Sequence, residues 1–402
     1  MQRVVIDEPY KFVPPVYSDW WPTMLRFILR RYIRKLYGVN TIQCRNVERL
    51  KASLAAGHSI LLAPNHSHMA DPMVLGVLGM EADCHLFAMA SWHVFKQSKF
   101  QTFMTRRMGA FSILREGNDR QAIETAIEIL ISRQRPLIVF PEGTITRHND
   151  LIADMMDGPS FIARQVAKRL KKENKPGGVV IIPVATRYYF DGDLTTSVGP
   201  DLEALETMLS WQPQRHLSLV DRITKIGQAL LSLKEIEFLG APTSGNIYER
   251  AEKLVEKVLS RLESEWNITD RSGNAMMRVK RLRTAILPDL VDGKVTPDDR
   301  ERRWRDLAAA YYVQQISHYP RDYILREKNL PERVIETVER LQEDFTDKST
   351  IHAPMHAIIE VGEAIPVGTQ RERDELGDPI MAEVRRQLQT MIDGMAAERT
   401  PV

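Results

Sequence analysis

Short apolar runs alternate with helical patterns between residues 59 and 200. Runs with the length of buried strands occupy residues 59–63, 85–88, 136–140 and 179–184. Between them, residues 121–133 and 160–172 repeat apolar side chains at helical spacing. Strands that alternate with helices predict an α/β domain with a largely parallel sheet flanked by helices. Functional side chains of such a sheet gather in the loops beyond the carboxyl ends of its strands.

The pattern changes between residues 201 and 351, where helical periodicity replaces the strand-like runs. Helices are expected at about 217–233, 247–266, 298–316 and 331–345. A strand-like run then returns at 355–365, followed by a helical pattern at 379–395. We therefore expect residues 49–200 and 352–402 to form the α/β domain and residues 201–351 to form a helical insertion.

Residues 1–48 form a separate N-terminal segment that contains an amphipathic helix. Between Trp20 and Val47 the chain carries six basic residues and no acidic one. One apolar stripe at helical spacing consists of Leu25, Ile28, Leu29, Tyr32, Ile33 and Leu36. A basic amphipathic helix is typical of a segment that lies on a membrane phospholipid surface. A helix packed on its own domain, with solvated arginines, explains the same pattern equally well.

Composition narrows the class of protein. The net charge of +2 gives no indication of nucleic acid binding. Cys44 and Cys84 are the only cysteines, which excludes a disulfide framework and indicates a reducing compartment. The N-terminal sequence lacks the apolar core of a signal peptide, and no apolar run reaches the length of a spanning helix. We therefore expect a cytoplasmic protein, peripheral on the cytosolic face of a membrane.

The first candidate site lies in residues 65–72, directly after the run at 59–63. An imidazole takes a hydroxyl proton near neutral pH when a carboxylate fixes its tautomer, so His66 and Asp71 are candidate catalytic residues. Asp71 and Pro72 have the pattern of a helix N-cap followed by proline at the first helical position. His66 would then lie in the preceding loop and fold back on the carboxylate. On these residues alone, a purely structural helix cap is an equally good interpretation.

Three further segments carry candidate chemistry. Phe140-Pro141-Glu142-Gly143-Thr144 follows another strand-like run and can offer backbone N–H groups, a hydroxyl and a carboxylate to an anionic ligand, with Arg147 nearby. On these residues alone, a simple turn is the better interpretation. The remaining two segments are 109–115, which ends on Arg115, and 182–184, a strand with a proline.

Together and in this order, the four segments resemble the phosphate acyltransferase family that includes the 1-acylglycerol-3-phosphate acyltransferases. The Asn-His-x4-Asp block of that family is matched by Asn65, His66 and Asp71, and its Phe-Pro-Glu-Gly-Thr block by residues 140–144. Gly109, Phe111 and Arg115 match the second block loosely, and residues 182–184 match the fourth. The resemblance covers residues 50–200, and 355–395 resembles the strand and helix that close the family's domain.

The sequence departs from the family pattern at three places. Ile145 stands where many members have arginine, although Arg147 matches a second arginine, and Leu114 stands where aspartate is frequent. The helical insertion is not part of the common pattern. These departures affect the identity of the acceptor more than the chemistry.

The resemblance implies an O-acyltransferase of phospholipid synthesis. His66, oriented by Asp71, would deprotonate an acceptor hydroxyl, which attacks the thioester of acyl-CoA or acyl carrier protein. The family assigns substrate binding to the positions of Asn65, Arg115, Glu142, Gly143, Thr144 and Arg147, and it needs neither a metal nor another cofactor. The expected acceptor is 1-acylglycerol-3-phosphate, and glycerol 3-phosphate or another lysolipid in a remodelling reaction is the alternative. Acyl-chain length, oligomeric state and the role of the insertion stay open.

Two other classes of function fit part of the same residues. His66, His68 and Asp71 are near the metal-binding pattern of a metallo-hydrolase, but Asp71 falls one residue late and Pro72 replaces the final histidine. A non-catalytic lipid-binding protein could also keep the fold. Intact His66, Asp71 and Glu142 favour an enzyme.

Overall fold

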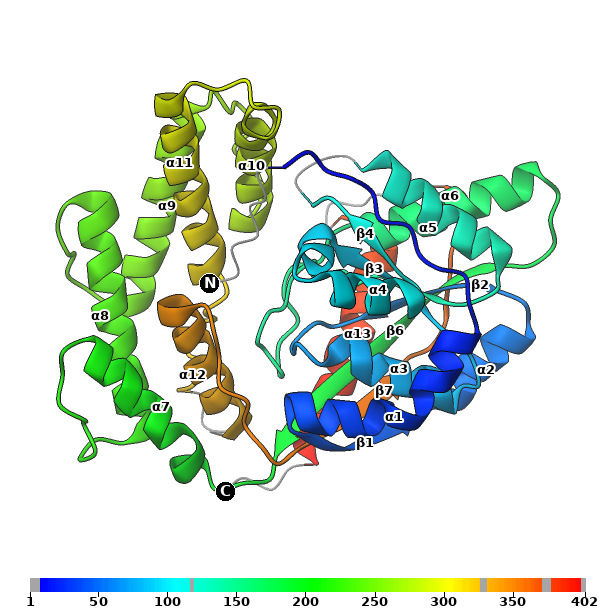
Figure 1. Ribbon diagram of the computed structural model, residues 1–402, viewed down its shortest axis with the longest axis horizontal. Coiled ribbons are helices and arrows are strands. Elements are labelled where there is room, and N and C mark those ends of the chain that lie inside the picture. The colour runs from blue at the N-terminus through cyan, green and yellow to red at the C-terminus, as the bar shows by residue number, and fades with distance from the viewer. Residues whose placement is uncertain (1–7, 116–118, 326–330, 371–376, 399–402) are drawn as a thin grey trace. The chain divides into compact units, whose positions relative to one another are not determined.

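The chain forms two compact units in the computed structural model, which describes residues 8–115, 119–325, 331–370 and 377–398 (Figure 1). The first unit consists of Lys11–Gly192 together with Ile351–Val402. The second consists of Asp193–Thr350 together with residues 8–10. The first unit is a mixed α/β domain and the second is helical.

The described part of the first unit contains an eight-stranded sheet, and the prediction of a largely parallel sheet is confirmed. Its strands are β1 (Val39–Arg45), β2 (Ser59–Pro64), β3 (Phe87–Ser91), β4 (Ala110–Ile113), β5 (Leu137–Ile138), β6 (Val179–Phe190), β7 (Met355–Val361) and β8 (Ile365–Pro366). Their order is β1-β7-β6-β2-β5-β3-β4, with β8 on β6. Among the described strands, only β7 and β8 pair in antiparallel fashion, each with β6.

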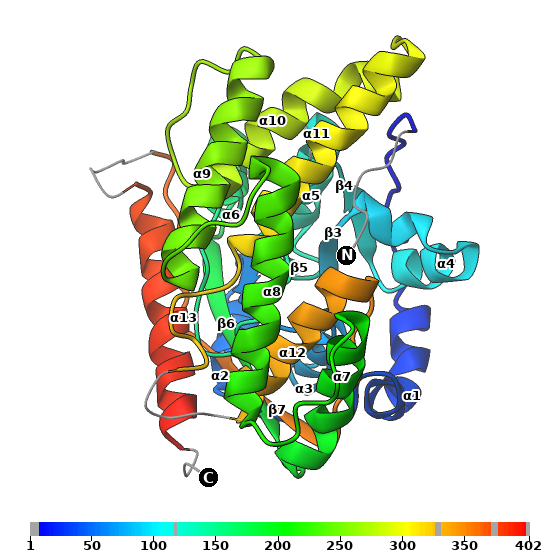
Figure 2. The ribbon, with the colours of Figure 1, turned by 90° about the vertical axis from the view of Figure 1, so that its left-hand side faces the viewer.

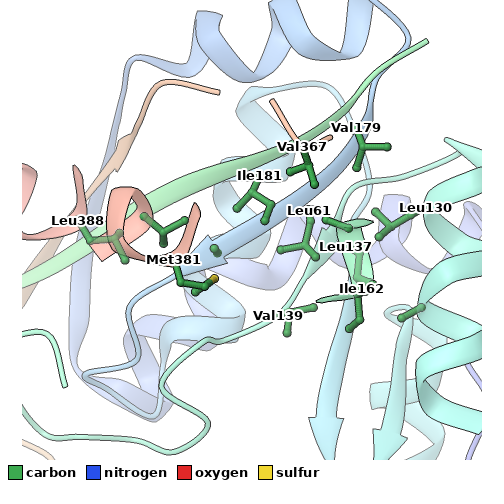
Figure 3. Packing of buried hydrophobic residues seen from close by; sticks show 14 of the residues in the cluster. Leu61, Leu130, Leu137, Val139, Ile162, Val179, Ile181, Val367, Met381 and Leu388 are labelled. Carbon is green, nitrogen blue, oxygen red and sulfur yellow. The ribbon is translucent and has the colours of Figure 1, made fainter. Parts of the chain in front are cut away.

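Helices cover both faces of this sheet, which is why β2 and β6 are buried along their whole length. On one face, α5 (Arg120–Ser132), α6 (Gly158–Lys172) and α13 (Pro379–Ala397) enclose a continuous apolar core with Leu61 and Ile181 (Figure 3). On the other face lie α2 (Val47–Ala55), which packs near β7, and α3 (Asp71–Glu81) with α1 (Trp20–Tyr37) against it. The short helices η1 (Trp92–Lys96) and α4 (Lys99–Arg107) connect β3 to β4.

The N-terminal helix α1 packs on the α/β domain and does not form a separate body. Leu25, Leu29 and Ile33 of the predicted stripe are buried against the domain. The rest of that stripe, Ile28, Tyr32 and Leu36, stays exposed, together with Phe27, whose side chain is 88% exposed. Half of the stripe is therefore core, and a second apolar row on α1 faces outward.

The second unit is a helical assembly with its own core. It contains α7 (Leu194–Met208), α8 (Leu219–Leu239), α9 (Ile247–Glu265), α10 (Ala275–Val291), α11 (Pro297–Ile316) and α12 (Pro331–Thr346), which are labelled in Figure 2. Leu254, Leu262, Leu282 and Val313 belong to one buried cluster of α8 to α11. No described helix of the protein is both long and apolar enough to span a bilayer.

Several elements differ from those that the sequence predicts. The run at 179–184 continues as a strand to Phe190, because β7 pairs with its second half from Val184 onward. The run at 136–140 yields only the two-residue strand β5 before the chain turns at Pro141. β1, which the sequence analysis missed, pairs with β7 from the far end of the chain.

Candidate active site

Two loops meet at the carboxyl edge of the sheet. β2 ends at Pro64 and leads into residues 65–70, and β5 ends at Ile138 and leads into residues 139–157. Because β2 and β5 are parallel neighbours, both loops leave the sheet at the same edge. This topology brings the segment of His66 next to the segment of Glu142.

His66 and Asp71 form a buried pair. His66 Nδ1 lies 2.9 Å from Asp71 Oδ2, and the two residues are 9% and 0% exposed. Because a carboxylate only accepts, Nδ1 carries the proton of a neutral imidazole and Nε2 is left as the acceptor. This arrangement suits a general base whose tautomer is fixed by a carboxylate. The catalytic assignment of both residues stays a prediction that this geometry supports.

Three donors hold the Asp71 carboxylate. Oδ2 also accepts from the backbone N–H of His68 at 2.9 Å, and Oδ1 accepts from the Tyr188 hydroxyl at 2.5 Å. Asp71 is the first residue of α3, and the N-cap is Ala70, so the prediction that Asp71 caps this helix is wrong. The carboxylate turns back toward the loop instead, because the His66 ring and the His68 amide face it there.

The backbone of His66 is held on both sides by the second loop. Its N–H donates to Glu142 Oε1 at 2.7 Å. Its carbonyl accepts from the Thr146 N–H at 2.8 Å and from the Thr146 hydroxyl at 3.1 Å. The Phe140 ring stacks on the imidazole with a centroid distance of 4.0 Å. The Phe-Pro-Glu-Gly-Thr segment therefore positions the histidine ring and its backbone.

Glu142 links two stretches of loop through its carboxylate. Oε2 accepts from the Ala153 N–H at 2.9 Å, so each oxygen has a backbone donor. Burial raises the pKa of Glu142 to about 7, against the lowering effect of these two hydrogen bonds. The observed contacts of Glu142 organise the site, and its predicted contact with the acceptor stays a prediction.

The other predicted substrate-binding residues lie at different depths around this edge. Asn65 is buried, and its side-chain amide exchanges two hydrogen bonds with the backbone of Thr186 on β6. Gly143 has a φ of +70°, in the left-handed region that favours glycine, and a Cβ there would displace the flexible end of the Met156 side chain. Thr144 is half-buried beside it, and Arg147 is buried in the same loop.

Arg115 follows β4 and is half-buried. β4 pairs with β3 at the far end of the strand order from β1, so Arg115 comes from a different part of the same carboxyl edge than His66. The role of Arg115 in binding phosphate stays a prediction.

The sequence analysis missed Tyr188, Thr146 and Asn149. Asn149 exchanges two hydrogen bonds with the backbone of Tyr188, in the same way as Asn65 does with Thr186. A cue was present, because β6 changes from purely apolar residues to Thr-Arg-Tyr-Tyr in its second half. Polar side chains at the carboxyl end of a buried strand are typical of a site.

His68 contributes to the packing of this region. Its Nδ1 accepts from the Ala70 N–H at 3.1 Å, and its ring lies 4.5 Å from that of Tyr188. Across the described residues, the structure has no group of three His, Cys, Asp or Glu side chains arranged to hold a metal ion.

The family model Acyltransferase matches residues 41–187. The matched region lies entirely within the α/β unit and corresponds to an acyltransferase domain. The matched range runs from β1 to Arg187 in β6 and contains His66, Asp71 and the 140–144 segment. The resemblance inferred from the four motifs is confirmed, and the protein is an O-acyltransferase. A search among curated proteins found no significant match to the chain.

Proposed function

We propose that this acyltransferase moves a fatty acyl group from acyl-CoA or acyl carrier protein to the hydroxyl of a glycerol phosphate or lysophospholipid, with 1-acylglycerol-3-phosphate as its acceptor in phospholipid synthesis. The buried His66–Asp71 pair at the carboxyl edge of the acyltransferase domain carries the proposal. It supplies a base with one defined accepting nitrogen, as direct transfer to an alcohol requires.

The reaction needs no covalent acyl-enzyme. His66 Nε2 takes the proton of the acceptor hydroxyl while the oxygen attacks the thioester carbonyl. The C–S bond then breaks, and the imidazolium of His66 gives the proton to the leaving thiolate. Asp71 keeps the ring oriented and stabilises its positive charge during transfer. The substrates supply every atom that moves, so the protein contributes a proton relay and a fixed geometry.

The acceptor phosphate would be held by Arg115, Arg147 and the loop of Gly143 and Thr144. Arginine forks and backbone N–H groups suit phosphate, and the family assigns these positions to the acceptor. The acyl thioester would be the only other substrate, with no further cofactor.

A peripheral position on the cytosolic face of a membrane fits this substrate class. The outward row of α1 presents Phe27, Ile28 and Tyr32, and Arg31 and Arg34 lie exposed on the same helix. Apolar side chains beside bases are typical of a segment that binds an anionic lipid surface. This row is a different set of residues from the buried half of the predicted stripe.

Acyl transfer by the purified protein tests the proposal. Radiolabelled acyl-CoA and acyl carrier protein are offered with 1-acylglycerol-3-phosphate, glycerol 3-phosphate and other lysolipids, and the products are separated. We expect His66→Ala to lower kcat by about 10²–10⁴-fold. His356→Ala is the matched control. His356 lies on β7, outside the site, and its Nδ1 pairs with Asp191 at 2.7 Å.

Other outcomes decide against the proposal. A His66→Ala variant that keeps a tenth of the wild-type kcat would exclude the histidine as the base. Loss of activity in a chelator would favour a metallo-hydrolase, whereas we expect no change. Transfer to glycerol 3-phosphate in preference to the lysolipid would show that the protein is the alternative, a glycerol-3-phosphate acyltransferase.

A further inference from the structure

Two segments without acidic residues meet on the surface of the acyltransferase domain. Residues 20–47 include α1, and residues 84–115 include η1 and α4, and neither contains Asp or Glu. The Trp21 and Phe103 rings lie 5.5 Å apart, which joins the beginning of α1 to α4. The Arg107 guanidinium lies over both rings. Aromatic and basic side chains thus form one continuous feature across two helices.

This surface exposes large apolar side chains. Phe100 on α4 is 73% exposed and Trp20 on α1 is 63% exposed, and no residue of α4 is buried. Lys96 and Lys99 lie exposed beside Phe100. Isolated exposed apolar residues are ordinary on a protein surface, but a cluster ringed by bases marks an interaction site.

The surface lies at the functional edge of the sheet. η1 and α4 follow the carboxyl end of β3, which is parallel to β5, so they leave the sheet at the same edge as the loop of Glu142. Met69, three residues after His66, is also exposed there. A lipid acceptor drawn from a bilayer at this surface would have a short path to the histidine.

We propose that α4 and the outward row of α1 form one docking surface for an anionic phospholipid membrane. The inference rests on the proposed function and extends it, because it assigns membrane contact to α4 as well as to α1. Both segments carry basic residues and no acidic residue, so their charge is complementary to that of an anionic membrane surface. Aromatic side chains suit the headgroup region, where a ring is partly buried and partly wet.

Vesicle sedimentation of the full chain tests the surface, with equal parts of phosphatidylserine and phosphatidylcholine against phosphatidylcholine alone. We expect Phe100→Glu and Phe27→Glu each to weaken binding to the anionic vesicles by about tenfold or more. Phe161→Glu is the matched control, because Phe161 is exposed on α6, which covers the opposite face of the sheet. Binding should fall as salt is raised.

Three results would overturn the docking surface. These are equal vesicle binding by Phe100→Glu and wild type, equal loss in the Phe161→Glu control, or a dimer without vesicles that Phe100→Glu dissociates. The last result would assign the patch to a second copy of the chain. Acyl transfer to a short-chain acceptor in free solution is measured in parallel and should be unchanged in Phe100→Glu. If the wild type acylates no acceptor, the proposed function fails while vesicle binding still tests the surface.

A second observation concerns the site itself. Tyr188 is fully buried on β6, and its hydroxyl donates to Asp71 Oδ1 at 2.5 Å. Burial and the charge of Asp71 raise the pKa of Tyr188 well above its ordinary value, so the hydroxyl keeps its proton. Asn149 pins the backbone of Tyr188 through two hydrogen bonds. The tyrosine is thus a fixed donor.

We infer that Tyr188 is a positioning residue that acts on His66 through Asp71. A carboxylate with donors on both oxygens cannot rotate, so its Oδ2 stays directed at His66 Nδ1. Tyr188→Phe keeps the ring against His68 and removes only the donor. We expect kcat to fall about tenfold while KM for both substrates stays within twofold, because one hydrogen bond to a charged group is lost.

A double-mutant cycle separates this role from a structural one. In an Asp71→Ala background, Tyr188→Phe should cause no further fall in kcat, because the group through which it acts is gone. Tyr189→Phe is the matched control, since the Tyr189 hydroxyl donates to the Met395 carbonyl on the other face of the sheet. An additive loss in the double variant, or an equal loss in Tyr189→Phe, would refute the inference.

Discussion

Replacement of Asp71 by asparagine is expected to preserve the geometry of the site while removing its charge. Oδ2 of Asp71 faces two donors, the His66 ring N–H and the His68 backbone N–H. The amide oxygen must take that place, because a backbone N–H cannot accept from an NH2 group. The NH2 group then faces the Tyr188 hydroxyl, whose oxygen can accept. Asp71→Asn should therefore leave His66 with its proton on Nδ1.

The expected loss follows from the missing charge. Opposite unit charges about 4 Å apart at an effective dielectric constant near 20 attract by about 4 kcal/mol. The imidazolium that forms during transfer loses this attraction, which corresponds to roughly a thousandfold in rate. In a catalytic triad where asparagine inverts the histidine tautomer, the loss is about 10⁴-fold. A loss of about 10²–10³-fold is therefore the specific expectation here.

Release of free thiol from acyl-CoA, followed with saturating acceptor, measures kcat directly. Asp191→Asn provides the control, because it changes the second His–Asp pair of the same domain. A loss smaller than tenfold would show that the Asp71 charge contributes little to catalysis. A loss as large as that of Asp71→Ala would show that the tautomer is not retained.

Three further predictions concern Arg115, Glu142 and the Arg164–Asp378 pair. Arg115→Ala should raise KM for a phosphate-bearing acceptor at least tenfold more than KM for the thioester, because a charge-assisted contact is worth about 1.5–3 kcal/mol. Equal effects on the two KM values would show that the arginine has a structural role. Glu142→Ala should lower the free energy of unfolding by about 2–4 kcal/mol in urea titrations, because two backbone N–H groups lose their acceptor; an unchanged midpoint would contradict this. Burial raises the pKa of Asp378, but hydrogen bonds from the Arg164 guanidinium and the Ser160 hydroxyl outweigh burial and lower that pKa from 3.8 to about 2. The Arg164–Asp378 pair therefore stabilises the fold above pH 3.8, and that contribution disappears as pH falls through about 2. Arg164→Met should be less stable than wild type at neutral pH, with a difference that narrows below pH 3.8.

The pairing of His66 with Asp71 was predictable because it is local. Asp71 comes five positions after His66, and Pro72 fixes where the helix can begin. The sequence does not show how the Asp71 carboxylate is oriented. Two of its three donors belong to His68 and to Tyr188, and Tyr188 lies 117 positions after Asp71. A rule based on spacing assigns Asp71 to a helix cap, and the tertiary donors override it.

The α/β fold was predictable from buried parallel strands, whose apolar runs need no partner to be recognised. β1 was not predicted, because apolar and polar residues alternate only weakly in its sequence VNTIQCR and because its partner β7 begins more than 300 residues later. The apolar stripe of α1 illustrates a second limit of prediction from the sequence. Periodicity identifies the helix, but it does not show that Leu25 and Leu29 face the domain while Ile28 and Tyr32 face outward.

The second half of β6 explains how a site built from two loops stays rigid. Successive side chains of this strand point to opposite faces of the sheet. Thr186 and Tyr188 hold Asn65 and Asn149 through their backbone groups, so both loops are attached to one strand. Arg187 lies between them and pairs with Asp150 at 2.7 Å on the face of α13. Because β7 hydrogen-bonds along this same stretch, the returning C-terminal strand supports the base and its carboxylate from across the sheet.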